Sequence, residues 1–328
     1  MLLMLSACGG GGSSTPTSPP PVTPPPTPTN TWSITGTLLD TIGRQTIGGA
    51  TVTPSWGLAA VTTNSGGQYS LGATTNPPTN PYKLTLSAEG YLTREQWITW
   101  QSGARTGITL DLIRNAAPFS MDYYKQLVRG TYDRTDGPWP VLRWTEPPSF
   151  YLKTVDQNGR AIEPEVLLVV REALGRAVPA YTGNLYSART IETGVDTRDQ
   201  LPGWINVTIV RDPSQRNLCG SAFIGRNPGE ITLYNDVCSC GSVKIPGATV
   251  MHEVGHALGF FHVGDNRSVM FPFIPGNCPP GDLSATERFH AGLAYQRPRG
   301  NADPDNDPPS GQLLSPGDFP GPTIRVRN

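Results

Sequence analysis

The run from His252 to His262, which reads HEVGHALGFFH, constrains this chain more than any other feature. It contains three of the four histidines of the chain, together with one carboxylate and two glycines. Residues four apart on an α-helix lie on the same face, so His252 and His256 can bind one metal ion from the same side. The run therefore predicts a helix that carries two metal ligands.

The third ligand requires the chain to turn after this helix. Gly259 can adopt the positive φ that ends a helix, and His262 can then return to the metal. Three neutral imidazoles leave the fourth position of a tetrahedral Zn²⁺ ion for water, whose pKa then falls towards about 7. Glu253 follows the first ligand and is placed to accept a proton from that water. We expect one catalytic zinc ion with Glu253 as the general base.

The residues around the run support a buried helix. Pro246 suits the first helical turn, and apolar residues recur at helical spacing, namely Val250, Val254, Ala257 and Leu258. This apolar stripe is ordinary core packing, which buries one face of the helix while the histidines use another.

A methionine follows His262 by eight residues, within the segment from Ser268 to Phe273. With this methionine, Met270, the sequence resembles the metzincin zinc metallopeptidases, most closely the matrixin-like branch. The resemblance extends over residues 119–299 and implies a turn at Met270 beneath the zinc site. It also implies a pocket wall that binds substrate, formed by Phe271, Pro272 and Phe273. The chain departs from matrixins at Val263, where they usually have serine.

The rest of this region fits an α+β fold with a mixed, twisted sheet. We expect a helix over residues 163–178, strands over 204–210, 221–225 and 230–234, and a capping-box helix start at 283–287. The resemblance implies that one strand is a sheet edge that pairs with an extended substrate through Ser221, Ala222 and Phe223. A plain internal strand is the equal alternative. His290 is expected to be a packed or surface histidine rather than a ligand.

Residues 32–114 form a different kind of sequence. Short β-branched stretches alternate with turns rich in Gly, Asn and Pro, which predicts an all-β sandwich. Their order resembles the carboxypeptidase regulatory-like, or transthyretin-like, domain. The expected organisation is thus multidomain: this sandwich, followed by the zinc peptidase domain over 115–299.

The first 31 residues indicate export. Leu5-Ser6-Ala7-Cys8 resembles a bacterial lipobox, in which Cys8 is lipidated, and the residues that follow form a linker rich in Pro, Thr, Gly and Ser. The positive segment of a full signal peptide is missing, so we expect the natural start to lie upstream. We expect a lipoprotein of the bacterial cell envelope, or an extracellular protein. An ordinary cytosolic N-terminus is the alternative.

Four further cysteines fit an exported protein: Cys219, Cys238, Cys240 and Cys278. An even number favours disulfides. Cys238 and Cys240 are poorly placed to bond each other, so each is expected to pair with Cys219 or Cys278, in either of two arrangements. A structural zinc site is the alternative, although no CxxC spacing supports it.

Charge excludes one class of partner. The net charge is −1 and no basic cluster occurs, so nucleic acid binding is not expected. Residues 300–328 are rich in Asp, Pro, Gly and Asn and are expected to lack fixed structure. The acidic run 303–307 offers oxygen ligands for Ca²⁺, but Pro304 and the missing ligand period favour a solvated tail.

The sequence thus predicts a zinc-dependent endopeptidase that acts on proteins or peptides. We expect a monomer that meets the membrane only through its lipid anchor. The alternative function is a cell-surface binding or adhesion lipoprotein whose metal site is vestigial. The intact set of three histidines and one glutamate argues against this alternative.

Overall fold

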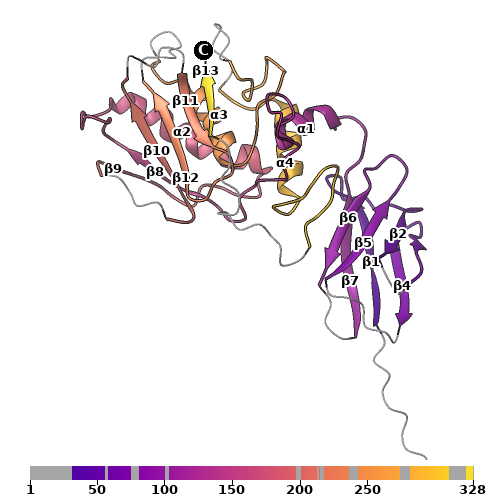
Figure 1. Cartoon of the computed structure of the whole chain (residues 1–328). Coiled ribbons are helices and arrows are strands. Elements are labelled where there is room, and N and C mark those ends of the chain that lie inside the picture. The colour runs from indigo at the N-terminus through magenta and orange to yellow at the C-terminus, as the bar shows by residue number, and fades with distance from the viewer. Residues whose placement is uncertain are drawn as a thin grey trace, which may run out of the picture.

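The computed structural model describes residues 32–55, 58–74, 81–99, 103–196, 201–212, 214, 218–235, 243–273, 281–309 and 323–327. Its N-terminal region is β-rich and its C-terminal region is α+β (Figure 1). Among the described residues, we find no helix with the length and apolar character needed to cross a membrane.

The N-terminal region contains two sheets that share one hydrophobic core. The first has the order β4-β1-β7 and the second the order β3-β2-β5-β6. Alternate residues point inward, for example Ile34 and Leu110 from the first sheet and Val52 and Leu84 from the second. The strands are β1 (Trp32–Asp40), β2 (Thr51–Pro54), β3 (Val61–Thr62), β4 (Gln68–Thr74), β5 (Tyr82–Ser87), β6 (Arg94–Ile98) and β7 (Ala104–Leu112).

The C-terminal region is built on one six-stranded sheet in the order β13-β11-β12-β10-β8-β9. Its strands β9, β8, β10 and β12 are parallel, whereas β11 runs antiparallel to both of its neighbours. The strands are β8 (Ser149–Lys153), β9 (Ile191–Gly194), β10 (Trp204–Val210), β11 (Leu218–Phe223), β12 (Gly229–Tyr234) and β13 (Thr323–Arg327).

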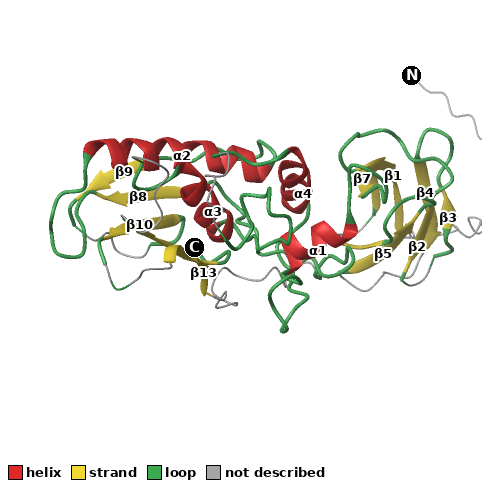
Figure 2. Ribbon diagram, turned by 90° about the horizontal axis from the view of Figure 1, so that it is seen from above, coloured by secondary structure: helices red, strands yellow, loops and turns green. Residues whose placement is uncertain are grey.

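Helices cover one face of this sheet, as Figure 2 shows for α2 and α3. The helices are α1 (Met121–Arg129), α2 (Pro164–Thr182), α3 (Gly247–Ala257) and α4 (Ala285–Tyr295). Helix α2 buries Val166, Val170 and Leu174, which recur at helical spacing, and it ends at Gly183 with a φ of 60°. It therefore begins where the sequence predicts and extends four residues further.

The expected strand over 204–210 is confirmed as β10, and the capping box is confirmed at the start of α4. Ser284 Oγ accepts a hydrogen bond from the backbone N–H of Glu287, and the Glu287 carboxylate accepts one from Ser284. The same carboxylate accepts a hydrogen bond from Ser268 Oγ at 2.5 Å. Glu287 thus caps α4 and also holds the segment before Met270.

The prediction of an unstructured tail is wrong for residues 301–309 and 323–327. Asn301 and Asp305 are fully buried, and residues 323–327 form β13. The side chains of Asp305 and Asp307 are buried rather than solvated, and each is paired with an arginine. Arg297 binds Asp305 at 2.7 Å, and Arg94 of the N-terminal region binds Asp307 at 2.7 Å. These ion pairs account for the burial of Asp305 and Asp307 without a bound Ca²⁺ ion.

These contacts join the two regions. We define the junction network by its members, which contribute charges or amides from both regions and are buried except for the partly buried Asp111: Arg94, Asp111, Arg129, Arg297, Asn301, Asp305 and Asp307. Arg297 also donates to Asp111 on β7 at 2.9 Å, and the backbone N–H of Asp307 donates to Glu95 of β6. Residues 297–307 therefore fix the β-rich region against the α+β region.

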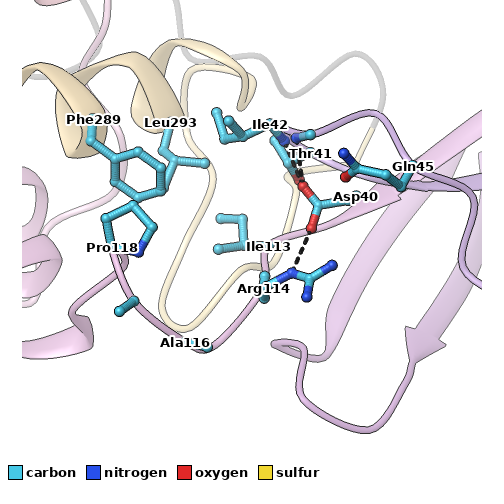
Figure 3. Close-up of a pocket in the computed structure, with 12 residues that line it drawn as sticks. Asp40, Thr41, Ile42, Gln45, Ile113, Arg114, Ala116, Pro118, Phe289 and Leu293 are labelled. Atoms are coloured by element: carbon cyan, nitrogen blue, oxygen red, sulfur yellow. Dashed lines mark hydrogen bonds and ion pairs between the residues drawn. The ribbon is translucent and has the colours of Figure 1, made fainter.

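A hollow of about 400 Å³ lies beside this junction, between β1, the segment after β7 and α4 (Figure 3). Ile113, Phe289 and Leu293 line its apolar side. On its polar side the Asp40 carboxylate accepts hydrogen bonds from Arg114 Nε at 3.1 Å and from two backbone N–H groups. The carboxylate in this hollow is thus already paired within the protein.

Candidate metal centre

Helix α3 positions the site, and a glycine ends it as the sequence predicts. Gly259 has a φ of 108°, and a Cβ at this position would lie 2.8 Å from the carbonyl of Leu142. Only glycine satisfies both the positive φ and this close approach. Its N–H donates to the carbonyl of His256 at 2.8 Å, which closes the turn. The chain then reverses and brings His262 back to the helix.

The three histidines of the motif converge. The Nε2 atom of His252 lies 2.8 Å from that of His256 and 3.2 Å from that of His262. The His256 and His262 Nε2 atoms are also 3.2 Å apart. A tetrahedral zinc ion with bonds of about 2.0–2.1 Å separates its nitrogen ligands by about 3.3–3.4 Å. The three nitrogens therefore form a triangle close to the size that zinc requires.

The other ring nitrogens show why these Nε2 atoms face one another. Each Nδ1 lies at hydrogen-bond distance from an acceptor that has no proton to give. The His252 Nδ1 meets the carbonyl of Val269 at 2.6 Å, and the His256 Nδ1 meets the carbonyl of Phe260 at 2.8 Å. Each of these rings must carry its proton on Nδ1, which leaves the Nε2 lone pair free.

The third ring is oriented by a carboxylate. The His262 Nδ1 lies 2.6 Å from Asp133 Oδ2, so it also donates from Nδ1. Three lone pairs then point at one another without a proton between them, an arrangement that a cation relieves. The donor set fits zinc, because neutral imidazoles are among its preferred ligands. Burial lowers the pKa of His252 to about 3, and it also lowers the pKa of His256, so both rings stay neutral as ligands must.

Glu253 is fully buried beside these rings. Among the described residues, neither of its carboxylate oxygens has a hydrogen-bond partner. Burial raises its pKa well above the usual range, because no nearby charge compensates for the lost water. On β11, Gly220 makes room for this side chain, since a Cβ there would collide with the Glu253 carboxylate. The arrangement supplies a proton-accepting group that the fold itself does not use.

Met270 lies against helix α3. Its Sδ atom accepts a hydrogen bond from the Tyr181 hydroxyl at 3.0 Å, and a Cβ on Gly255 would lie 2.5 Å from it. The Met270 carbonyl accepts the N–H of Val263 at 3.0 Å. The segment that contains Met270 is thus fixed both to α3 and to the residue after the third histidine.

The residues predicted to bind substrate lie in two places. Phe271 and Phe273, on either side of Pro272, follow Met270 directly, and their rings pack edge to face at 5.8 Å. Phe273 is exposed. Ser221, Ala222 and Phe223 belong to β11, next to α3. The expectation that β11 is the sheet edge is wrong here, because β13 pairs with its outer side.

Sequence reasoning missed two residues of the site, Asp133 and Tyr181. Asp133 lies 129 positions before its partner His262, in a loop after α1 where no local pattern marks it. Tyr181 lies near the end of α2, among apolar residues of the same helix. His290 lies outside the cluster: its Nε2 accepts the N–H of Ser120 at 2.9 Å, and its ring packs against Tyr123.

The cysteines are described only in part. Cys219, on β11, is buried and disulfide-bonded. Cys238, Cys240 and Cys278 lie outside the described residues, as does Cys8. The expected pairing and the lipid anchor therefore stay predictions.

Comparisons with solved structures give distant similarities. A cohesin–X-dockerin complex from Acetivibrio cellulolyticus matches at 15% identity, over 25% of this chain and 56% of its own, with a TM-score of 0.20. Metalloproteinase-II from Bacteroides fragilis matches at 14% identity, over 66% of this chain and 79% of its own, with a TM-score of 0.32. This chain spans little more than half the length of the first of these. No curated protein matches the chain.

A family match covers the N-terminal region. Residues 33–113 match the carboxypeptidase regulatory-like domain. The match coincides with the two sheets that share one core. The N-terminal part of this chain is therefore a carboxypeptidase regulatory-like domain.

Proposed function

We propose that this chain is a zinc-dependent endopeptidase whose metal ligands are His252, His256 and His262. The observation that carries the proposal is the convergence of three Nε2 lone pairs within 3.2 Å, each fixed by an acceptor at Nδ1. A packed core has no use for three such lone pairs, and a divalent cation satisfies all of them.

Bound zinc would polarise a carbonyl and lower the pKa of a water molecule on its fourth position. Glu253 accepts the proton of the attacking water and delivers it to the leaving amine. Its lack of partners among the described residues leaves both carboxylate oxygens free for these transfers. The absence of a side chain at Gly220 leaves room for this carboxylate against β11.

The finer assignment is to a matrixin-like metzincin. Met270 supports it by its contacts with α3 and with Val263, the residue that follows the third histidine. Phe271, Pro272 and Phe273 provide an apolar surface directly after it, which we assign to a substrate side chain. An extended peptide could pair with β11 only in place of β13, which occupies the outer side of that strand. The backbone N–H and C=O groups of β11 would then give affinity without sequence preference.

The location and partners follow from the sequence alone. We propose an exported lipoprotein, anchored through Cys8, that acts as a monomer on protein or peptide substrates. The carboxypeptidase regulatory-like domain then lies between the anchor and the metal centre in chain order.

The test compares the wild-type chain with Glu253→Gln on a casein substrate, with zinc content measured on both. We expect one zinc ion per chain in each protein and a loss of about 10²–10⁴-fold in turnover for the variant. The amide keeps the shape of the side chain but cannot accept the proton.

Two outcomes would contradict the proposal. A well-folded wild-type chain that binds no added zinc would remove the metal centre. A zinc-loaded wild-type chain without hydrolytic activity would favour the alternative of a surface binding protein with a vestigial site.

A further inference from the structure

Strand β13, formed by the C-terminal residues Thr323–Arg327, pairs antiparallel with β11. Five residue pairs define the register, from Leu218 opposite Arg327 to Phe223 opposite Thr323. On its other side β11 pairs with β12, so the backbone of β11 is occupied on both sides. Figure 1 shows β13 in yellow at the end of the sheet, beside β11.

The register places β13 at the candidate active site. Val326 pairs with Gly220. Gly220 lies directly against the Glu253 carboxylate, where a Cβ would collide with it. The backbone of residues 323–327 therefore runs past a residue of β11 that lies directly against the proposed base. The remaining pairs extend to Ala222 and Phe223, which are the residues assigned to substrate binding.

We propose that residues 323–327 are an autoinhibitory strand that competes with extended peptide substrates for β11. The proposal rests on the proposed function of the same site. An extended peptide and β13 need the same backbone N–H and C=O groups of β11, so the two cannot bind together.

The competition favours the chain's own segment. Residues 310–322 connect β13 covalently to the described segment that ends at residue 309, so β13 cannot diffuse away from β11. A segment tethered in this way acts at an effective concentration in the mM range. A free peptide of similar affinity at µM concentration displaces it only rarely. The full chain therefore has a raised apparent KM, whereas kcat is unchanged because the catalytic residues are intact.

The first experiment removes the strand. A chain that ends at residue 322 is compared with the full chain on a quenched fluorescent peptide. We expect the apparent KM to fall by at least about tenfold, with kcat and zinc content unchanged. Within the full chain, Val326→Pro should release the inhibition, because proline lacks an amide N–H and is disfavoured in strands. Val326→Thr is the matched control and should stay inhibited, since threonine keeps a high strand propensity.

The second experiment does not need catalysis. A fluorescently labelled peptide with the sequence of residues 323–328 is titrated with each chain, and its anisotropy is measured. We expect it to bind the truncated chain and Val326→Pro at least about tenfold more tightly than the full chain and Val326→Thr. The same peptide added to the truncated chain should inhibit hydrolysis competitively.

The outcomes separate this proposal from the proposed function. Differential peptide binding without hydrolysis by any zinc-loaded chain would retain the strand competition and reject the peptidase. Hydrolysis with an unchanged KM after truncation would retain the peptidase and reject the competition. A fall in kcat together with zinc loss would show that β13 is only a structural strand.

Discussion

The junction network and the histidine cluster are both buried and polar, but their groups are paired to different degrees. In the junction, every carboxylate meets an arginine: Asp305 meets Arg297, Asp307 meets Arg94, and Asp111 meets both arginines. In the histidine cluster, three Nε2 lone pairs face one another, and the Glu253 carboxylate has no hydrogen-bond partner among the described residues. Buried polar groups without partners are costly, and this cost supports the proposal that the cluster binds a cation and takes part in a reaction.

The two regions should therefore respond differently to substitution. Loss of one junction group leaves an unpaired charge and lowers the stability of the whole chain. Loss of one group in the histidine cluster removes a ligand or a base and affects zinc binding or turnover. Each prediction below tests whether this division holds.

The largest effect is expected for His256→Ala. The variant loses one of the three converging nitrogens, so we expect no stoichiometric zinc and hydrolysis no greater than that of chelator-treated wild type. Zinc content by elemental analysis and casein turnover are the measurements. His290→Gln is the matched control, because His290 is a buried histidine outside the cluster, and it should retain zinc. Zinc retained by His256→Ala would show that the ligand set is wrong.

The next effect concerns the junction. Arg297 is fully buried between Asp305 and Asp111, and Arg297→Ala leaves both carboxylates without this partner. We expect the free energy of unfolding to fall by about 3–5 kcal/mol in urea denaturation. The matched control is Arg189→Ala, which removes an exposed pair with Glu146 and should cost about 0–1 kcal/mol. Equal losses in the two variants would mean that the junction is no more important than a surface ion pair.

The sequence predicts the core of the candidate metal centre because the proposed ligands are close together in the chain. The helical spacing of His252 and His256 and the conformational freedom of Gly259 are properties of adjacent residues, and the structure brings all three into the expected positions. The same reasoning could not find Asp133. Its role depends on a loop that approaches His262 only in the folded chain.

The C-terminal residues were predicted wrongly because their partners, like the partner of His262, are not close in sequence. An acidic, proline-containing stretch is typical of solvated tails, and its composition gives no sign of the arginines that bury it. Arg94 comes from β6 and Arg129 from α1, so the partners of Asp307 and Asn301 are remote in sequence. The occupied side of β11 was unpredictable for a related reason, because strand pairing over 100 residues is set by topology rather than by pattern.

A smaller effect is expected for the residue that orients His262. Asp133→Asn keeps the shape of the side chain but removes the negative charge that fixes the ring through Nδ1. We expect zinc affinity to weaken by about 10–100-fold, with the free energy of unfolding of the metal-free chain little changed. Competition with a chromogenic chelator measures the affinity. Asp136→Asn, which alters an exposed aspartate of the same loop paired with Arg134, is the control. An unchanged affinity for Asp133→Asn would assign Asp133 to loop structure alone.

The smallest effect is the pH dependence of the junction. Burial alone would raise the pKa of Asp111, but the charges of Arg297 and Arg94 and a hydrogen bond from Thr41 outweigh it, so the pKa is lowered. A carboxyl whose folded pKa lies below its unfolded value of about 3.9 stabilises the protein above that pH. This contribution is lost as the pH falls through the folded pKa. Asp111→Asn should therefore be less stable than wild type by about 1.5 kcal/mol from pH 5 to 7.

That stability difference should narrow below about pH 4, where the Asp111 carboxyl of the unfolded wild-type chain takes up a proton before that of the folded chain does. It should close once the folded carboxyl is also protonated and resembles the amide. Thermal unfolding of both chains over a series of pH values measures it. Comparing the two chains at each pH removes the contribution of all other acids, including Asp307, whose pKa burial raises. A difference that stayed constant down to pH 2 would mean that the Asp111 charge contributes nothing. Packing and hydrogen bonds, rather than ion pairs, would then stabilise the junction. The junction and the histidine cluster would still differ in whether their polar groups have partners, but not because of the Asp111 charge.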